Sequence, residues 1–149
     1  MSQPFQINGR EIRLIEYSTE RNWSAQLPRR EWLCVLLSHD QHCRYLDEVF
    51  NKLIFQDVCY VCTIGKQCEL AHDLLDEEIN YREVEEPAPY LPKHHIMTTW
   101  HQELEEGLWF AIYAAHHETV SLRQIVILDM TGGMELPQVK HFLTRFLPS

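Results

Sequence analysis

The chain lacks several features that would place it in a common class of protein. No apolar run in its 149 residues approaches the ~20 residues that a membrane-spanning helix needs. Its first residues, Met1-Ser2-Gln3-Pro4, lack the basic and apolar regions of a secretory signal peptide. Neither GxGxxG nor a P-loop motif occurs, so both common nucleotide-binding fingerprints are missing. These absences predict a cytoplasmic protein that does not enter a membrane.

Basic residues are also scarce. The chain has 13 Lys and Arg against 22 Asp and Glu, which gives a formal net charge of −9. A field of that sign repels the phosphates of nucleic acids and of anionic lipids, so we expect no nucleic-acid partner. The same field accelerates the encounter with a basic protein, which is the partner that the composition favours.

The five cysteines do not form a recognisable metal or redox motif. The only CxxC pair is Cys59 and Cys62, in a strand-like run where residues three apart point to opposite faces. A structural zinc site of this type needs a second CxxC, which is absent. We therefore predict no cofactor and no metal. The nearest candidates for a divalent cation are His72, Asp76 and His101.

What the chain does contain is an alternation of strand-like and helix-like segments. The apolar runs typical of buried strands are 32–38, 58–64, 95–99 and 124–128. The segments with apolar residues at helical spacing are 45–55, 67–80, 103–116 and the stretch that follows Pro137. This alternation predicts a single three-layer α/β domain, Rossmann-like or flavodoxin-like. We expect a mostly parallel sheet of about four strands with helices on both faces.

The first 30 residues have a different pattern. Asn8-Gly9 separates two short apolar runs, 5–7 and 12–15, and this dipeptide favours the turn that matches the twist of paired strands. We predict an N-terminal hairpin and loop extension over 1–30, followed by the α/β domain over 31–149.

A cluster of polar side chains follows the predicted strand 58–64. On a helix, Cys68, His72 and Asp76 lie four residues apart on one stripe, next to Asp73. A His with a carboxylate one turn away acts as a base and its orienting acid, or binds a cation. Cys68 is the candidate nucleophile, because a helix N-terminus lowers a thiol pKa. An exposed helix face on which Asp76 simply holds His72 explains the same pattern.

A second polar cluster follows the predicted strand 95–99. Trp100 offers a flat wall on which a ring can stack, and His101 is a candidate acid, base or metal ligand. Thr99 and Glu103 add polar atoms beside them. The structural alternatives are that Trp100 covers the edge of the core and that His101 pairs with a nearby Glu.

Both clusters come after strands, and in an open α/β sheet ligands bind outside the carboxyl ends of the strands. We therefore expect one shared site, with Gly65 allowing a tight turn and the close approach of a ligand. The candidate catalytic residues are His72, Asp73, Asp76, His101 and Cys68. The candidate ligand-binding residues are Gly65, Trp100, Thr99 and Glu103.

The two motifs together resemble a family of small, uncharacterised bacterial α/β proteins. One motif is C-x3-H-D-x2-D from Cys68 to Asp76, and the other is M-T-T-W-H from Met97 to His101. The resemblance covers roughly residues 31–130. The chain departs from it at Ala71, where the family pattern has a Trp before His-Asp. The resemblance groups the chain with that family and implies no activity.

Two functions fit these observations. The first is a small acidic binding module, of the immunity type or a regulatory adaptor, with a basic protein partner. The second binds a small polar ligand, or is a nucleotide-directed or metal-dependent hydrolase or transferase with a His/Asp site at the carboxyl ends of the strands. We favour the first because the sequence contains no complete catalytic constellation. The distance between His72 and His101 discriminates between the two.

Overall fold

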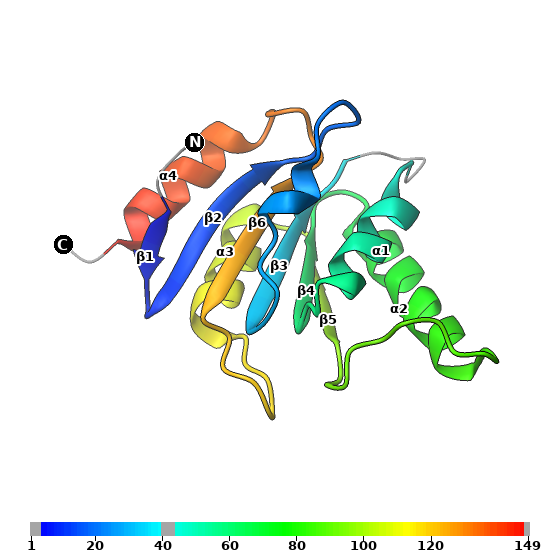
Figure 1. The fold of residues 1–149 in the computed structure, drawn as a ribbon. Coiled ribbons are helices and arrows are strands. Elements are labelled where there is room, and N and C mark those ends of the chain that lie inside the picture. Colours follow the sequence, from blue (N-terminus) through cyan, green and yellow to red (C-terminus); the bar gives the residue numbers. More distant parts are fainter. Residues whose placement is uncertain (1–3, 40–43, 148–149) are drawn as a thin grey trace.

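The computed structural model describes residues 4–39 and 44–147. Six strands form one sheet in the order β1-β2-β6-β3-β4-β5 (Figure 1). The strands are β1 (Phe5–Ile7), β2 (Arg10–Glu16), β3 (Trp32–Leu37), β4 (Tyr60–Ile64), β5 (Met97–His101) and β6 (Gln124–Asp129). The helices are α1 (Leu46–Phe55), α2 (Cys68–Val84), α3 (Leu104–Trp109) and α4 (Leu136–Phe146), with a 3-10 turn at Trp23–Gln26 and a π-helical segment at Phe110–Ala114.

The N-terminal hairpin is confirmed, and it is part of the main sheet. Asn8 and Gly9 have φ values of 54° and 71°, so both lie in the left-handed region that a tight hairpin turn of type I′ requires. β1 pairs antiparallel with β2, whereas β2 pairs parallel with β6. The prediction of about four strands is wrong, because the hairpin adds two more to the sheet.

Helices pack on both faces of the sheet. α1 and α2 bury side chains with one set of strand residues, and α3, the π-helical segment and α4 bury theirs with the alternate set (Figure 1). β3 is covered on both faces, and all six of its residues are buried. This is why its sequence is a continuous apolar run and not an alternating one.

The chain reverses direction across the sheet between β3 and β6. β3, β4 and β5 follow one another outward, with α1 and α2 as the connections, and the chain then returns to place β6 on the other side of β3. The helices that follow β3 and β6 cover opposite faces of the sheet. The carboxyl ends of these two neighbouring strands therefore form a topological switch point.

β5 is the edge strand of the sheet, and it lies two residues later than predicted. Its parallel register with β4 runs from Tyr60↔Met97 to Ile64↔His101, so Trp100 and His101 are inside the strand and do not follow it. Thr and Trp side chains suit a half-buried pleated surface, which explains the extension.

The helix predicted over 103–116 is α3 with the π-helical segment that continues it. The hairpin caps the carboxyl end of this segment: Asn8 donates to the Ile112 carbonyl at 2.8 Å. Arg10 donates to the carbonyls of Ala111 at 2.5 Å and Ala115 at 2.6 Å. These bonds satisfy carbonyls that the end of a helix otherwise leaves unpaired. Within the described residues, no helix is both long enough and apolar enough to cross a membrane.

Candidate functional site

The first polar cluster forms, and it joins α2 to β5. His72 Nδ1 lies 3.0 Å from Asp73 Oδ1, and His72 Nε2 lies 3.1 Å from the Thr98 hydroxyl and 3.5 Å from Asp76 Oδ2. The Thr98 hydroxyl donates to Asp76 Oδ1 at 2.8 Å. Both ring nitrogens of His72 therefore already have oxygen partners. The arrangement corresponds to the structural alternative, in which the helix holds its own His and also fastens itself to the edge strand.

The second cluster is divided between the two faces of the sheet. The His101 side chain is buried on the face that α3 covers, where its ring centroid lies 4.8 Å from that of Phe110. Its Nε2 lies 3.1 Å from the Thr99 hydroxyl and its Nδ1 lies 3.7 Å from Glu106 Oε1. Burial lowers the pKa of His101, and this outweighs the opposing effect of Glu106. His101 is thus a neutral histidine of the core at pH 7.

His72 and His101 do not meet, so the expectation of one shared site is wrong. His72 contacts Thr98, and Thr98 and His101 are three residues apart in β5, which directs their side chains to opposite faces of the sheet. The expectation depended on a strand that ended at residue 99. Because β5 continues to His101, the strand alternation separates the two histidines.

The remaining sequence candidates also lie apart. Cys68 is 3% exposed, and burial raises the pKa of its thiol despite the nearby helix N-terminus. This is the opposite of the shift that an activated nucleophile needs. Trp100 is 41% exposed at the sheet edge. The Thr99 hydroxyl donates to Cys62 Sγ at 3.4 Å, on the face of the sheet that α3 covers.

Gly65 and Glu103 line a hollow at the carboxyl ends of β3, β4 and β5. The hollow has a volume of about 270 Å³, and its polar lining also includes His39 and Glu135. His39 Nε2 lies 2.7 Å from Glu135 Oε1, which joins the end of β3 to the start of α4 across 96 residues. His39 Nδ1 is buried and has no hydrogen-bond partner among residues 4–39 and 44–147. No local sequence pattern predicts this pair, because the two residues meet only when β6 lies beside β3.

Gly65 is required by the packing of this hollow. Its φ is +127°, and a Cβ atom there would lie 2.6 Å from the Ser38 carbonyl oxygen and 2.9 Å from His39 Nδ1. Only a glycine adopts this conformation and leaves room for the histidine. The close approach that we expected at Gly65 is therefore made by the His39 side chain.

The carboxylate of Asp129, at the end of β6, accepts hydrogen bonds from the loop that follows it. Its Oδ1 accepts from the Thr131 amide at 2.8 Å and from the Thr131 hydroxyl at 2.5 Å. Its Oδ2 accepts from the Gly133 amide at 2.8 Å. The carboxylate orders the turn after β6 and leaves little capacity for a ligand. Asp40, the other aspartate that follows a strand, lies outside the described residues.

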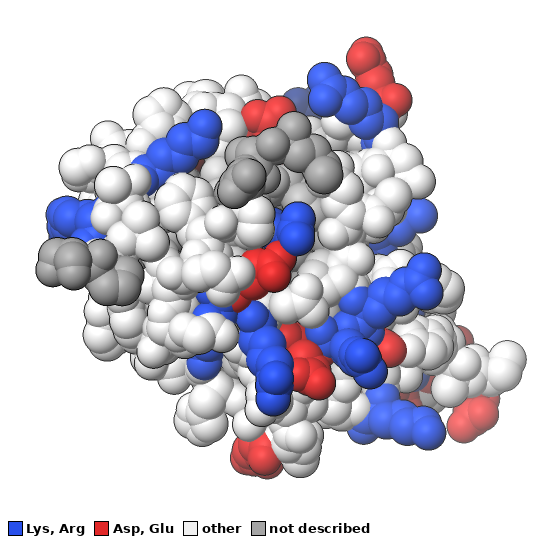
Figure 2. All heavy atoms as spheres, turned by 60° about the vertical axis from the view of Figure 1, so that its left-hand side comes forward, with Lys and Arg blue, Asp and Glu red and all other residues white. Residues whose placement is uncertain are grey.

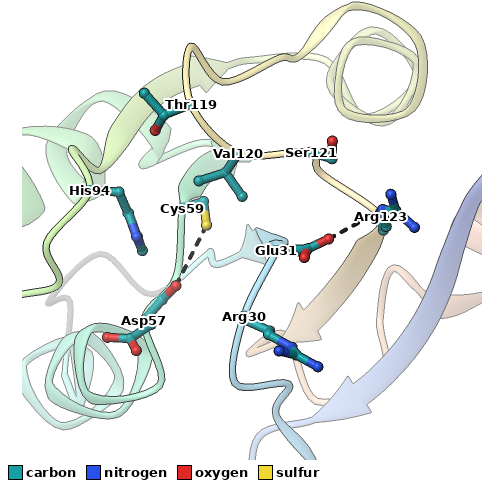
Figure 3. A pocket seen from close by; sticks show the side chains of 9 residues that line it. All are labelled: Arg30, Glu31, Asp57, Cys59, His94, Thr119, Val120, Ser121 and Arg123. Atoms are coloured by element: carbon teal, nitrogen blue, oxygen red, sulfur yellow. Dashed lines mark hydrogen bonds and ion pairs between the residues drawn. The ribbon is translucent and has the colours of Figure 1, made fainter.

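A second hollow, of about 400 Å³, lies at the amino ends of the strands, opposite the carboxyl ends that His39 and Gly65 line (Figure 3). Arg123 is paired with Glu31 at 3.2 Å, and His94 Nε2 lies 2.9 Å from the Val58 carbonyl oxygen. Cys59 faces this hollow, and burial raises the pKa of its thiol. Figure 3 shows the Arg30 side chain on the rim, directed away from Cys59. His94 and Cys59 contact backbone carbonyls and Arg123 contacts Glu31, so these three side chains do not converge on one point.

Metal ligands are not gathered anywhere in the parts of the chain that the structure describes. Residues 4–39 and 44–147 contain no group of three His, Cys, Asp or Glu side chains placed to hold an ion. Cys59 and Cys62 pack in the same hydrophobic cluster, because Cys59 precedes β4 and does not follow the strand alternation expected of it. Both are free thiols.

The negative charge of the molecule is concentrated around β5. Residues 68–107, from the start of α2 into α3, contain 11 of the 22 acidic residues but only two of the 13 basic ones. The formal charge of this segment, −9, equals that of the whole chain, and the 11 acidic and 11 basic residues elsewhere cancel. Figure 2 shows the side of the molecule that is on the left in Figure 1, where Lys and Arg lie among acidic side chains.

The acidic side chains of this segment are mostly available to a partner. Three of them on α2, Glu69, Glu77 and Glu83, are exposed. None of the three has an ion pair with any other described residue. Asp73 and Glu106 have side chains that are 61% and 70% exposed. A hollow of about 320 Å³ between α2 and β5 carries Asp76 and Glu83 on its wall.

Comparison with known proteins gives a family and no activity. A family described as "Domain of unknown function (DUF7684)" matches residues 12–146. No curated protein and no solved structure gives a significant match.

Proposed function

The chain belongs to the DUF7684 family of domains of unknown function, and we propose that it is a small acidic binding module for a basic protein partner in the bacterial cytoplasm. The observation that supports this most is the position of the charge. The entire excess of −9 lies in residues 68–107, which include β5, the edge strand of the sheet. A regulatory adaptor and an immunity-type protein that occludes a basic protein are the two forms this function takes.

Physical chemistry explains why such a distribution serves binding. A concentrated field of one sign steers an oppositely charged partner to one face of the molecule and raises the association rate. The field acts over about 8 Å at physiological salt, so its effect falls as salt is added. The same charge spread evenly over the surface would aid solubility without selecting a face.

The candidate catalytic groups favour binding over chemistry. His72 is held by Asp73, Asp76 and Thr98, and His101 is buried on the other face of the sheet. Burial raises the pKa of the Cys68 thiol. A nucleophile, a base and an oxyanion donor must converge on one reacting atom, and these groups do not.

The test is a random dodecapeptide display library panned against the protein at low salt. We expect enriched peptides with a net positive charge. Their affinity should fall at least tenfold in the triple variant Glu69→Gln, Glu77→Gln and Glu83→Gln. The matched control has the same change in net charge elsewhere, at three further exposed acids: Glu16→Gln, Glu20→Gln and Glu118→Gln. Enrichment of neutral or acidic peptides, or equal losses in both triple variants, would refute the proposed function.

A second candidate function is supported by the His39–Glu135 pair. It lines a hollow at the carboxyl ends of β3 to β5, beside the switch point where doubly wound, Rossmann-like α/β folds bind ligands. In this version the protein binds a small polar ligand there. A thermal-shift panel of nucleotides, amino acids and divalent cations tests it. A shift that is present in the wild type and lost in Glu135→Gln supports the second function; no shift with any compound removes it.

A further inference from the structure

We propose that the partner binds by strand addition: an extended basic segment pairs with the open edge of β5 and becomes a seventh strand of the sheet. This inference rests on the proposed function and specifies how its partner is held. The main-chain bonds would supply affinity, and the side chains on either side of β5 would select the sequence.

The hydrogen bonds of β5 identify which of its groups are available. The Met97 amide donates to the Cys59 carbonyl at 3.0 Å, and the His101 carbonyl accepts from the Gly65 amide at 3.3 Å. In a parallel ladder such bonds recur at every second residue, so Met97, Thr99 and His101 face β4. The N–H and C=O groups of Thr98 and Trp100 therefore point to the outer edge, where no described strand pairs with them.

Within its own five residues, β5 lacks the sequence features that usually protect an edge strand. Proteins prevent edge pairing with proline, with charged residues, with bulges, or by keeping the edge strand very short. The five residues Met97–His101 contain no proline, Lys, Arg, Asp or Glu, and their register with β4 is uninterrupted. The opposite edge of the sheet, β1, has only three residues. An unprotected edge of this length is a template for another chain.

The surroundings of the edge specify the chemistry of the added strand. Its alternate side chains would point to the α2 face, where the hollow of about 320 Å³ has an apolar floor that includes Ile79 and Ile96. Asp76 and Glu83 line the same hollow. Lys and Arg fit this combination, because their aliphatic stems pack on apolar surface while their charged ends reach carboxylates. The half-exposed ring of Trp100 adds a surface for a cation or an aliphatic stem.

A second copy of the chain is the alternative occupant of an open edge. Pairing of β5 with β5 would bring together two segments that each carry a formal charge of −9. Like charges placed opposite one another across an interface oppose association. A basic extended segment has the complementary charge, and it is the occupant that we assign to this edge.

The first test uses the decapeptide (Lys-Val)5 and the same peptide with alternate backbone nitrogens methylated. Methylation removes the donors that pair with β5 and leaves the charge unchanged. We expect the unmodified peptide to bind and to slow the hydrogen exchange of the Thr98 and Trp100 amides at least tenfold. The methylated peptide should bind at least tenfold more weakly.

The second test compares Trp100→Pro with Trp100→Ala. Both variants lack the ring, but only proline removes the outward N–H, and this N–H takes no part in the ladder with β4. We expect Trp100→Pro to bind (Lys-Val)5 at least tenfold more weakly than Trp100→Ala does. If Trp100→Pro fails to fold, the methylated peptide still decides the question.

The outcomes separate this inference from the function on which it rests. If both peptides bind equally and the amides of Thr98 and Trp100 exchange unchanged, strand addition is wrong while a charge-driven binding module stands. If neither peptide binds at low salt, strand addition by a basic segment fails, and the library selection then decides the proposed function. If the free protein sediments as a dimer with these two amides protected, a second copy occupies the edge and the inference is overturned.

Discussion

The Thr98 hydroxyl donates to Asp76 Oδ1 at 2.8 Å and so fastens α2 to the edge strand of the sheet. The same hydroxyl lies 3.1 Å from His72 Nε2, so one small side chain connects both polar residues of the helix. We expect Thr98→Val, which keeps the shape and removes the hydroxyl, to lower the free energy of unfolding by about 1–2 kcal/mol. Urea denaturation measures this change.

Thr98→Ser is the control for this prediction. It retains the hydroxyl and loses a methyl group at a half-buried position, so its cost should be smaller than that of valine. Equal stability of Thr98→Val and the wild type would mean that the polar cluster does not hold α2 in place.

Gly107 allows α3 to pack closely on the sheet. A Cβ atom at this position would collide with the Ile64 side chain and lie 3.1 Å from His101 Cβ. Glycine to alanine normally stabilises a helix by about 1 kcal/mol. Here we expect Gly107→Ala to destabilise the protein by about 1–3 kcal/mol, because overpacking outweighs helix propensity. Thermal unfolding measures the loss.

The double variant Gly107→Ala with Ile64→Val checks this explanation. Removing one methyl group from the residue that collides should recover part of the lost stability, although Ile64→Val alone costs about 0.5–1.5 kcal/mol. Strict additivity of the two changes would show that the packing of α3 on β4 is not the cause.

Local sequence patterns predicted the central elements because burial there is strong. β3 and β6 are apolar along almost their whole length, since both faces of the sheet are covered at those positions. The hairpin was predictable for a different reason: Asn8-Gly9 is one of the few dipeptides that adopts two successive positive φ values readily.

The candidate site was harder to predict because it depends on register and strand order. β5 lies two residues later than predicted, so His101 is inside the strand and its side chain points to the opposite face from Thr98, which contacts His72. The contact between His39 and Glu135 spans 96 residues and requires β6 to lie beside β3. Neither fact is encoded in a short stretch of sequence.

Arg10 secures the hairpin to the end of the π-helical segment. Its guanidinium group donates to the carbonyls of Ala111 and Ala115, and burial lowers its pKa. We expect Arg10→Gln to cost about 2 kcal/mol, because two charge-assisted bonds to otherwise unpaired carbonyls are lost. Arg13→Gln is the matched control: Arg13 is more exposed and pairs with Glu11 at the surface, so its change should stay within about 0.5 kcal/mol. Chemical denaturation of both variants measures the difference, and similar losses would contradict the prediction.

His101 should make the stability of the protein depend on pH on the acid side of neutrality. Burial lowers its pKa from the ordinary value of 6.5, so the unfolded chain takes up a proton at a higher pH than the folded one does. The contribution of neutral, buried His101 to the free energy of unfolding is therefore complete above about pH 6.5. It is lost as the pH falls through the lowered pKa of His101 in the folded state.

One proton contributes a slope of at most about 1.4 kcal/mol per pH unit. Urea midpoints measured between pH 7.5 and 4.5 should fall less steeply in His101→Gln than in the wild type, because the variant lacks this proton uptake. Thr99 and Glu106 are the polar residues in contact with the ring, and the Glu106 carboxylate opposes the shift. Glu106→Gln should consequently lower the His101 pKa further, as read from the proton resonances of its ring by NMR. Parallel pH profiles for the wild type and His101→Gln would show that His101 is not the group responsible.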